Sequence, residues 1–462
     1  MRLSHARRAI SVRFDDPNLV SCVGLAPVLA VATRCGLARL LTDGLCIAAR
    51  GGANAAAKIL ALVAGMIAGA DCIDDMDLLR HGGMGRLFTD VRAPSTLGTF
   101  LRTFTFGHVR QLDAVAAELL ARLAAATPIL AGISTVAFLD IDDTVRQTYG
   151  YAKQGTGRGY SGVKGLNALI ATVSTPLSAP VIAATRLRKG ATNSVRGAAK
   201  LLADALATAA RAGATGLVIV RADSAFYSYS IVAAARRAGA RFSVTARLTP
   251  TVTSAITTIG DDAWTPIRYP NAIWDDDEQR LVSDAEVAET EFTAFTSRRR
   301  RERVTARLIV RRVRRLNPKT VQAGQSEMFA VYRYHAVFTD SPEPMLDAEA
   351  THRDHAIIEQ VNADLKDSAL AHLPSGLFTA NAAWLVCAAL AHNLTRASGA
   401  LAGTFHARAR TGTIRAQLIN TPARIARSAH RLVLHLPQRW PWEAGLDELF
   451  RHALHDPLPA TT

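Results

Sequence analysis

The spacing of apolar and polar residues predicts a helical first region, followed by alternating strands and helices. Residues 1 to about 130 are rich in Ala, Leu and Val with few β-branched runs, which favours helices. From Leu130 the apolar runs become shorter and richer in β-branched residues. The predicted elements there are, in order, strands at Val136–Asp142, Gly165–Val173 and Ala179–Thr185, a helix at Ser194–Ala212 capped by Ser194, a strand at Leu217–Val220, a helix ending near Arg237 and a strand at Arg241–Arg247. This order indicates a mixed sheet with helices on its faces, and therefore an α/β fold.

The pattern changes again after residue 247. Residues 248–345 contain Thr-rich alternation and predict a β-rich insertion, with strands at Ala306–Val313 and Tyr332–Phe338. Beyond it, Glu349–Ala371 and the very apolar Ala380–Arg396 predict two helices, the second of them buried. We therefore expect several domains: a helical region at 1–130, a core split between 131–247 and 346–400, the insertion at 248–345 and a helical C-terminal region at 401–462.

Net charge narrows the class of partner. The chain has 54 Lys and Arg against 39 Asp and Glu, a net charge of +15 and a pI of about 10.1. Such a balance favours a polyanion, most simply nucleic acid. Residues 298–315 contain ten arginines, which predicts a surface that tracks phosphates, although a solvated basic face is the simpler alternative. The candidate DNA-binding residues are Arg298, Arg299, Arg300, Arg301, Arg311, Arg312, Arg314 and Arg315.

Neither a disulfide framework nor a membrane span is predicted. The five cysteines are scattered without a CxxC pair, which fits a reducing cytoplasm. The apolar stretch Leu19–Thr33 follows a basic start, but Asp15 and Asp16 precede it and no convincing cleavage site follows. Ile59–Ala70 is too short to span a bilayer. We expect both stretches to be core helices of a cytoplasmic protein with no membrane partner.

Acidic residues follow two of the predicted strands and occupy one predicted helix. Asp223 lies at the tip of the strand that begins at Leu217, Asp140 and Asp142 end the strand that begins at Val136, and Glu359 lies on a helix. A carboxylate at the tip of a buried strand is held rigidly while it faces a cleft. Carboxylates that converge from distant elements suit Mg²⁺ or Mn²⁺. Two such ions support an in-line phosphoryl displacement.

Each acidic position also has a plainer interpretation. Asp223 is as well suited to capping the helix that follows it, and Glu359 alone is typical of a solvated helix residue. The predicted helix nevertheless places His352, His355, Glu359 and Lys366 on one face, which favours contact with metal and phosphates. The HxxH spacing also suits zinc, but no third ligand is evident.

The motif Asp140-Ile-Asp142-Asp143-Thr144 fits a second enzyme class. It matches haloacid-dehalogenase-like phosphatases, in which Asp140 would be the nucleophile and Asp142 the general acid/base. Gly260-Asp261-Asp262 resembles the later acidic motif of that family, but the residues before it make a poor buried parallel strand. A small-molecule phosphatase also has no need of an arginine-dense insertion, so this class is the runner-up.

Several motifs together resemble transposases of the IS1380 group. The matching segments are Leu139–Thr144, Tyr149-Gly150, Gly155–Tyr160, Arg221–Tyr227, the helix His352–Lys366, His372–Gly376, Ala391–Leu394 and Leu436–Trp442. The resemblance covers about residues 10–445, and the combination is far more specific than any single motif. That group belongs to the DDE transposases, which have an RNase H-like core, and is similar to the IS4-type enzymes.

The resemblance implies a catalytic triad of Asp142, Asp223 and Glu359 that holds Mg²⁺ or Mn²⁺. Asp142 is chosen because the second Asp of the Asp-x-Asp-x-Thr motif aligns with the catalytic one, and Asp140 is the reserve. The related enzymes carry a Tyr-(2)-Arg-(3)-Glu-(6)-Lys signature on the last helix.

This chain keeps only half of that signature. Glu359 and Lys366 are retained, and Lys366 would contact a phosphate near the cut. His352 and His355 replace the Tyr and the Arg, so the roles of these two positions stay open.

The implied activity is metal-dependent endonuclease and strand-transfer chemistry on an insertion sequence. Water attacks the DNA at the terminal inverted repeats, and the freed 3′-hydroxyl then attacks target DNA. The resemblance implies that the helical region 1–130 is the DNA-binding region for the inverted repeat. The expected partners are double-stranded DNA and a second copy of the chain on paired ends, in a nucleoid-associated cytoplasmic protein. Trp264, Tyr269 and Trp274 are candidates for stacking on an unpaired base, with buried core aromatics the plainer interpretation. A nuclease without strand transfer and a non-catalytic DNA-binding relative remain as alternatives.

Overall fold

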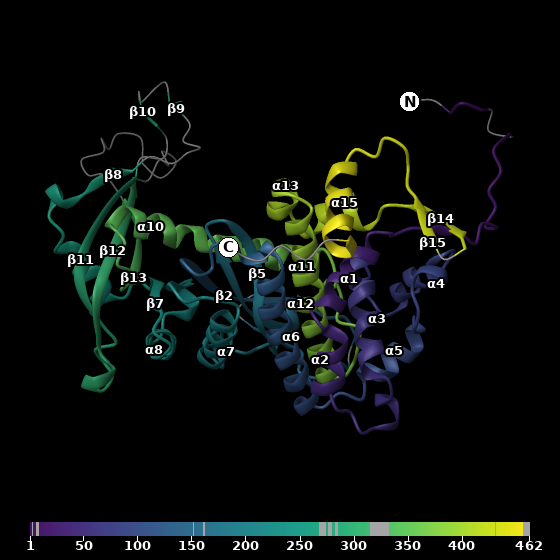
Figure 1. Ribbon diagram of the computed structural model, residues 1–462. Helices are drawn as coiled ribbons and strands as arrows, with labels where there is room; N and C mark the ends of the chain where they lie inside the picture. Colours follow the sequence, from purple (N-terminus) through teal and green to yellow (C-terminus); the bar gives the residue numbers. More distant parts are fainter. Residues whose placement is uncertain are drawn as a thin grey trace.

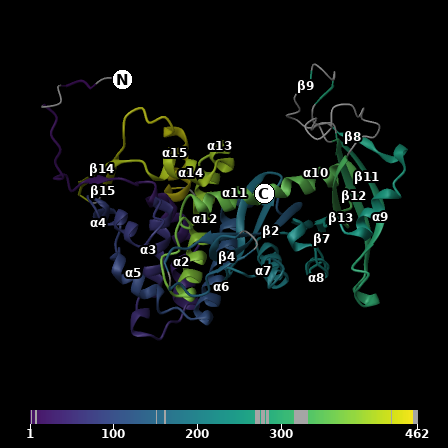
Figure 2. The ribbon, with the colours of Figure 1, turned by 180° about the vertical axis from the view of Figure 1, so that it is seen from behind.

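The computed structural model is an elongated α/β protein with strands at one end and helices at the other (Figure 1). It describes residues 1–455 except 2, 6–8, 151, 160–161, 268–273, 276–279, 282–284, 315–331 and 430. Figure 2 gives the opposite view, in which helices of the first region surround α12 while β11–β13 lie at the far end.

The centre of the molecule is a mixed sheet of five strands in the order β5-β4-β2-β6-β7. The strands are β2 (Val136–Gln147), β4 (Lys164–Thr175), β5 (Ser178–Lys189), β6 (Leu217–Ala222) and β7 (Arg241–Ala246). β4 is antiparallel to both of its neighbours, β2 and β5, whereas β6 runs parallel to β2 and β7 runs parallel to β6. The predicted strands and their α/β order are therefore confirmed. The prediction that the first strand ends at Asp142 was wrong, because β4 keeps pairing with β2 as far as Gln147.

The strands of the insertion continue the same sheet beyond β7. β13 (Tyr332–Thr339) pairs with β7, and β12 (Val304–Arg314), β11 (Ala285–Ala294) and β8 (Thr265–Ile267) follow in antiparallel order. The Thr-rich stretch forms helix α9 (Pro250–Thr257), whose N-cap Thr249 accepts a hydrogen bond from the Val252 N–H. The remaining short strands are β3 (Gly157–Arg158), which pairs with β4, and the pair β9 (Trp274–Asp275) and β10 (Arg280–Leu281).

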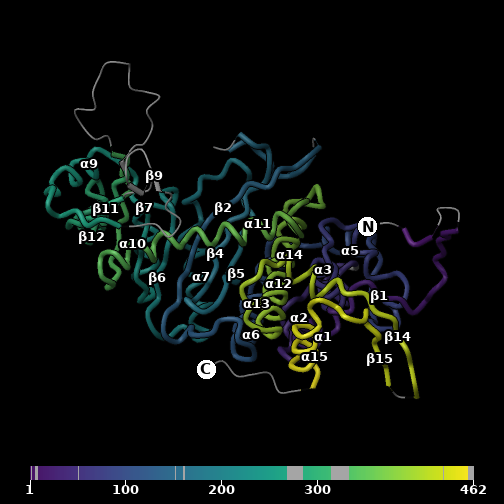
Figure 3. The backbone as a smooth tube through the Cα atoms, turned by 90° about the horizontal axis from the view of Figure 1, so that it is seen from above, coloured from purple at the N-terminus to yellow at the C-terminus, as the bar shows by residue number. Residues whose placement is uncertain are grey.

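Helices cover both faces of the central sheet. α7 (Ala198–Arg211) and α8 (Tyr229–Arg237) pack together on one face (Figure 1). α10 (Met345–Arg353) and α11 (Ile357–Lys366) cross the other face (Figure 3). The predicted single helix Glu349–Ala371 was wrong, because a 3₁₀ turn at Asp354–Ala356 separates α10 from α11. The break lets α10 pack on β11 and β12 while α11 packs on β2 and β5.

The predicted N-cap of α7 was also wrong. Gly197, in the left-handed conformation with φ 78°, precedes the first helical residue Ala198. Ser194 instead donates its hydroxyl to Asp143 on β2, at 3.2 Å. The segment before α7 is therefore anchored to the sheet.

The buried helix α12 (Phe378–Leu401) is the core of the helical end. It packs against helices of the first region and against β5. The helices of that region are α1 (Leu25–Arg34), α2 (Leu37–Gly44), α3 (Ala55–Ala68), α4 (Met84–Leu87), α5 (Pro94–Leu101) and α6 (Phe106–Ala126), with 3₁₀ turns at Arg50–Gly52, Asp74–Leu79 and Pro128–Leu130. The predictions of a mostly helical first region and a buried helix at Ala380–Arg396 are confirmed.

The C-terminal region is only partly helical, which corrects the prediction of a wholly helical one. It contains α13 (Thr404–Arg408), α14 (Thr411–Ile414), a π turn at Arg415–Ile419, β14 (Ala423–Ser428), β15 (Arg431–His435), α15 (Glu443–Phe450) and a second π turn at Arg451–His455. β14 pairs with both β15 and β1 (Leu19–Val20), so both ends of the chain meet in one small sheet.

Within the described ranges, no single helix is long and apolar enough to cross a membrane. The bent pair α1–α2 reaches the length and apolar composition of a membrane span only when its two helices are counted together.

Candidate active site

Asp140 and Arg221 face each other on β2 and β6 and form a buried ion pair. They are direct partners in the parallel register, and the guanidinium donates to both carboxylate oxygens at 2.7 and 2.8 Å. Arg221 also donates to the Thr351 carbonyl on α10 and lies over the Phe138 ring. Both side chains are almost fully buried. Asp140 is therefore held as the counter-charge of an arginine, beneath α10.

Asp142 and Asp223 lie side by side, one step further along the same two strands. Ile141 and Ala222 are the last paired residues of β2 and β6, so the two aspartates are the next positions on the face that carries Asp140. β6 ends there, and the Asp223 carboxylate accepts a hydrogen bond from the Ala225 N–H at 3.0 Å. The capping interpretation of Asp223 is thus confirmed, and it is compatible with a role in a site.

Helix α11 contacts Asp142 and carries Glu359 on a nearby turn. Asn362 donates its side-chain amide to the Asp142 carboxylate at 2.7 Å, which ties the helix to β2. Glu359 lies three residues earlier on the same helical face. Its side chain is exposed, as is that of Lys366 at the end of α11.

The two histidines do not act as a pair of metal ligands. His352 is buried, and its two ring nitrogens contact the hydroxyls of Ser243 and Thr245 on β7, each at 2.9 Å. Burial lowers the pKa of His352 to about 3, so the ring is neutral. His355 contacts the His352 carbonyl through Nδ1 at 2.6 Å, and it interacts electrostatically with Asp223. His352 therefore anchors α10 to the sheet, while His355 stands beside the acidic pair.

Electrostatics couple the two aspartates. Burial raises the pKa of Asp142 to about 6, and the charges of Asp223 and Asp143 add to the effect. Burial likewise raises the pKa of Asp223, opposed by the N–H groups of the following turn and by His355. Two partly buried carboxylates that disfavour each other's charge are the kind of pair that a divalent cation stabilises.

The three predicted carboxylates do not close into a tight cluster. Among the described residues, the group whose potential ligand atoms all lie within 4.8 Å is Asp71, Cys72 and Asp75. The structure thus brings Asp142 and Asp223 together and leaves Glu359 facing solvent from the neighbouring helix.

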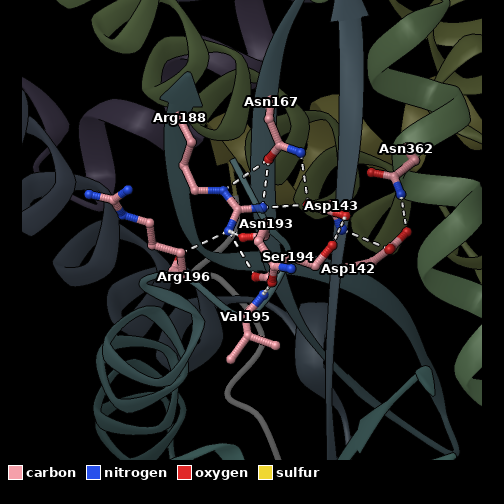
Figure 4. A network of polar contacts seen from close by, with 9 residues as sticks. All are labelled: Asp142, Asp143, Asn167, Arg188, Asn193, Ser194, Val195, Arg196 and Asn362. Carbon is pink, nitrogen blue, oxygen red and sulfur yellow. Dashed lines mark hydrogen bonds and ion pairs between the residues drawn. The ribbon is translucent and has the colours of Figure 1, made fainter. Parts of the chain in front are cut away.

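A buried polar network holds β2 from its opposite face (Figure 4). Asp143 accepts hydrogen bonds from Arg188, from Asn167 at 2.7 Å and from Ser194. Arg188 is buried and also donates to backbone carbonyls of the segment before α7. This network fixes the strand that carries Asp142 against β4, β5 and α7.

The predicted DNA-binding arginines fall into two sets. Arg298 to Arg301 lie in the exposed turn between β11 and β12, where Arg298 also pairs with Glu302. Arg311 and Arg312 are paired with Glu349 and Glu286. Arg314 is the last residue of β12, and Arg315 lies outside the described residues.

Trp264 packs as a core aromatic, as its plainer interpretation predicted. It is buried, and the Arg312 guanidinium stacks over its ring at 4.1 Å. Tyr269 lies outside the described residues, and Trp274 lies on β9.

The family model described as Transposase DDE domain group 1 matches residues 3–456. The chain belongs to this family of DDE transposases. No curated protein matches it. Membership in this family, together with the burial of Asp140 under Arg221, removes the support for a haloacid-dehalogenase-like phosphatase.

Sequence reasoning missed three residues of this DDE transposase that hold the site together. Asn362, Arg188 and Arg221 were not singled out, since their roles depend on partners 220, 45 and 81 residues away. Two of them had a signal: Asn362 lies three positions after Glu359 and so shares its helical face, and Arg221 begins one of the segments that resemble the IS1380 group.

Proposed function

We propose that this DDE transposase belongs to the IS1380 group and cuts DNA at the terminal inverted repeats of an insertion sequence. It then joins the freed 3′-hydroxyl ends to target DNA. The observation that carries the proposal is the adjacency of Asp142 and Asp223 at the point where β6 ends, beneath the helix that bears Glu359. Phosphoryl transfer is catalysed mainly by charged groups held in a fixed position, and it does not require a covalent bond between the protein and the substrate.

The strand order supports an RNase H-like core within the α/β fold. Three antiparallel strands are followed by a helix, a parallel strand, a second helix and a second parallel strand, in the order β5-β4-β2-β6-β7. We propose that residues 131–247 and 346–400 form this core, that 248–345 is an insertion which extends its sheet, and that 1–130 binds the inverted repeat. The remaining residues, 401–462, would then be a C-terminal region.

We assign the catalytic acids as Asp142, Asp223 and Glu359. Asp140 is excluded from this role because its carboxylate is fully engaged by Arg221. Asp142 faces α11 instead, and Glu359 lies on the face of that helix that Asn362 directs to Asp142.

The acidic pair fits the Mg²⁺ or Mn²⁺ that this chemistry uses. Burial and like charge raise the pKa values of Asp142 and Asp223, and a divalent cation offsets both effects. When bound, such ions activate the attacking oxygen and stabilise the leaving one. The chain's own contribution is to hold the ligands: the β2 backbone and Asn362 orient Asp142, and the turn after β6 orients Asp223.

DNA is the proposed partner, with a second copy of the chain on paired ends. The net charge of +15 and the exposed turn Arg298–Arg301 support contact with phosphates. Lys366 would contact a phosphate near the cut from the end of α11. Such a protein would be nucleoid-associated in the cell.

The proposal is tested by cleavage of a labelled duplex that carries the element's own inverted repeat, with Mg²⁺ or Mn²⁺. We expect wild type to nick at the repeat end, and Asp223→Ala and Glu359→Ala to lose nicking while they still bind DNA. The matched control is Gln360→Ala, an exposed neighbour of Glu359, which should cleave as wild type does.

Two other outcomes would contradict parts of the proposal. Binding without cleavage by wild type would indicate a non-catalytic relative. Cleavage without joining of the 3′-ends to a target plasmid would indicate a nuclease that lacks strand transfer.

A further inference from the structure

Asn362 carries a buried polar atom that nothing in the described structure satisfies. The residue is 6% exposed, and its amide nitrogen donates to the Asp142 carboxylate at 2.7 Å. The amide oxygen is buried and has no hydrogen-bond partner among the described residues. Buried polar atoms are nearly always paired, so an orphan beside two acidic residues calls for a partner that enters from outside.

Both oxygens of the Asp142 carboxylate are already oriented by the chain. One accepts from the Asp143 backbone N–H at 2.7 Å, and the other accepts from Asn362. Strand β2 and helix α11 therefore hold the same carboxylate from two sides (Figure 4). The same contact sets the register of α11 on the sheet, and with it the position of Glu359 one turn away.

The orientation of the amide follows from the charge of its neighbour. A carboxylate accepts hydrogen bonds and does not donate them, so the amide must present its nitrogen to ionised Asp142. The reverse orientation would place two acceptor oxygens against each other. The amide oxygen is consequently left over whenever Asp142 is in the ionised form that binds a cation.

An apolar side chain of similar size would fill this place without an orphan oxygen. Ile358, Val361 and Leu365 are buried apolar residues of α11, and its other buried polar residue, Asp364, has hydrogen-bond partners for both carboxylate oxygens. An amide at position 362 therefore gives the metal-free protein one hydrogen bond and one unsatisfied buried acceptor. The unsatisfied acceptor costs about as much stability as the hydrogen bond contributes, so the amide oxygen is expected to have a function.

We propose that Asn362 is a positioning residue of the cation site. Its amide nitrogen fixes the Asp142 carboxylate as a ligand. Its amide oxygen accepts a hydrogen bond from a water molecule that enters in the hydration shell of the cation. The inference rests on the proposed function, because it assumes that Asp142 and Asp223 bind a divalent cation. Hydrogen-bond partners of metal ligands commonly change metal affinity by roughly 10–100-fold when they are removed.

The test measures the affinity of the full chain for Mn²⁺ without DNA. Electron paramagnetic resonance gives the concentration of free Mn²⁺ at each step of the titration. Asn362→Leu should weaken Mn²⁺ binding by roughly 10–100-fold. Its thermal midpoint in EDTA shows whether the variant is folded, because the substitution removes both the orphan oxygen and the hydrogen bond to Asp142. Asn362→Ala is a second variant that avoids overpacking. If the Leu variant does not fold, the same loss of Mn²⁺ affinity in Asn362→Ala supports the inference. Gln360→Leu, exposed on the same helix, is the control and should bind as wild type does.

Two results separate this inference from the proposed function. If Asp142→Asn abolishes Mn²⁺ binding while both Asn362 variants bind as tightly as wild type, Asn362 has only a structural role and the inference is wrong. If wild type and Asp142→Asn bind Mn²⁺ equally, the cation site itself is wrong and the proposed function fails with it. With DNA present, excess Mn²⁺ should restore cleavage to the Asn362 variants and leave Glu359→Ala inactive.

Discussion

Three aspartates within four residues of β2 have three different surroundings. Asp140 and Asp142 point to the face covered by α10 and α11, and Asp143 points to the face covered by α7. Asp140 meets Arg221, Asp142 meets Asn362, and Asp143 meets Arg188. The alternation of the strand therefore assigns one carboxylate to a buried ion pair, one to the candidate site and one to a supporting network.

Loss of Asp140 should mainly destabilise the fold. Asp140→Ala leaves the buried Arg221 charge uncompensated, and we expect the free energy of unfolding to fall by about 3–5 kcal/mol. Urea unfolding measures this change. Asp140→Leu combined with Arg221→Met should recover most of the loss, because replacing a buried pair by apolar groups is often neutral. If Asp140→Ala were as stable as wild type yet unable to cut DNA, Asp140 would be a catalytic group.

At the scale of elements, α12 closes the edge of the central sheet. Asn393 accepts from the Ile182 N–H of β5 and donates to the carbonyl of the same residue, each at 2.8 Å. Its amide thus forms the two hydrogen bonds that a neighbouring strand would otherwise form. This contact lies next to a shift in the register between β4 and β5. The motif Ala391–Leu394 that resembles the IS1380 group therefore has a structural reason here: an edge strand is closed by a helix.

The substitution Asn393→Leu tests whether the edge strand β5 depends on its hydrogen bonds to α12. The substitution leaves a buried N–H and a buried carbonyl of Ile182 without partners, so we expect a loss of roughly 2–5 kcal/mol in the free energy of unfolding. Denaturant unfolding with circular dichroism detects it. Ser398→Ala is the matched control, since the Ser398 hydroxyl bonds only a carbonyl of its own helix. Equal stability of the two variants would show that the edge of β5 needs no partner.

Over the whole molecule, one sheet runs from the candidate site out to the arginine-rich strands. β13 pairs with β7, so continuous strand pairing connects the turn with Arg298–Arg301 to the strands that carry Asp142 and Asp223. A phosphate backbone bound at this turn would keep a fixed geometry relative to the site. Arg311 and Arg312, which the sequence also nominated, are instead held by acidic residues.

The salt dependence of DNA binding tests this arrangement. Arg299→Ala with Arg300→Ala removes two exposed cations from the turn. We expect the slope of log K against log salt to fall in magnitude by about 2, because each lost phosphate contact removes ~0.9. Fluorescence anisotropy with labelled duplex at several salt concentrations gives the slope. Arg237→Ala with Arg241→Ala, on exposed residues at the end of α8 and the start of β7, is the control. An equal change in both double variants would mean that the turn has no special role.

The sequence by itself determined the order of strands and helices in the core, because buried runs and their breakers are local signals. It also nominated Asp140, Asp142 and Asp223, since acidic residues after apolar strands are conspicuous, and Glu359 on a predicted helix, while the resemblance to the IS1380 group chose Asp142 over Asp140. Only the tertiary structure decided that Asp142 and Asp223 are adjacent, because the register of β2 on β6 joins residues 81 positions apart. It also decided that His352 is a neutral anchor on β7 and that a 3₁₀ turn breaks the last helix. These facts depend on which residues meet across the sheet, and periodicity along the chain carries no information about that.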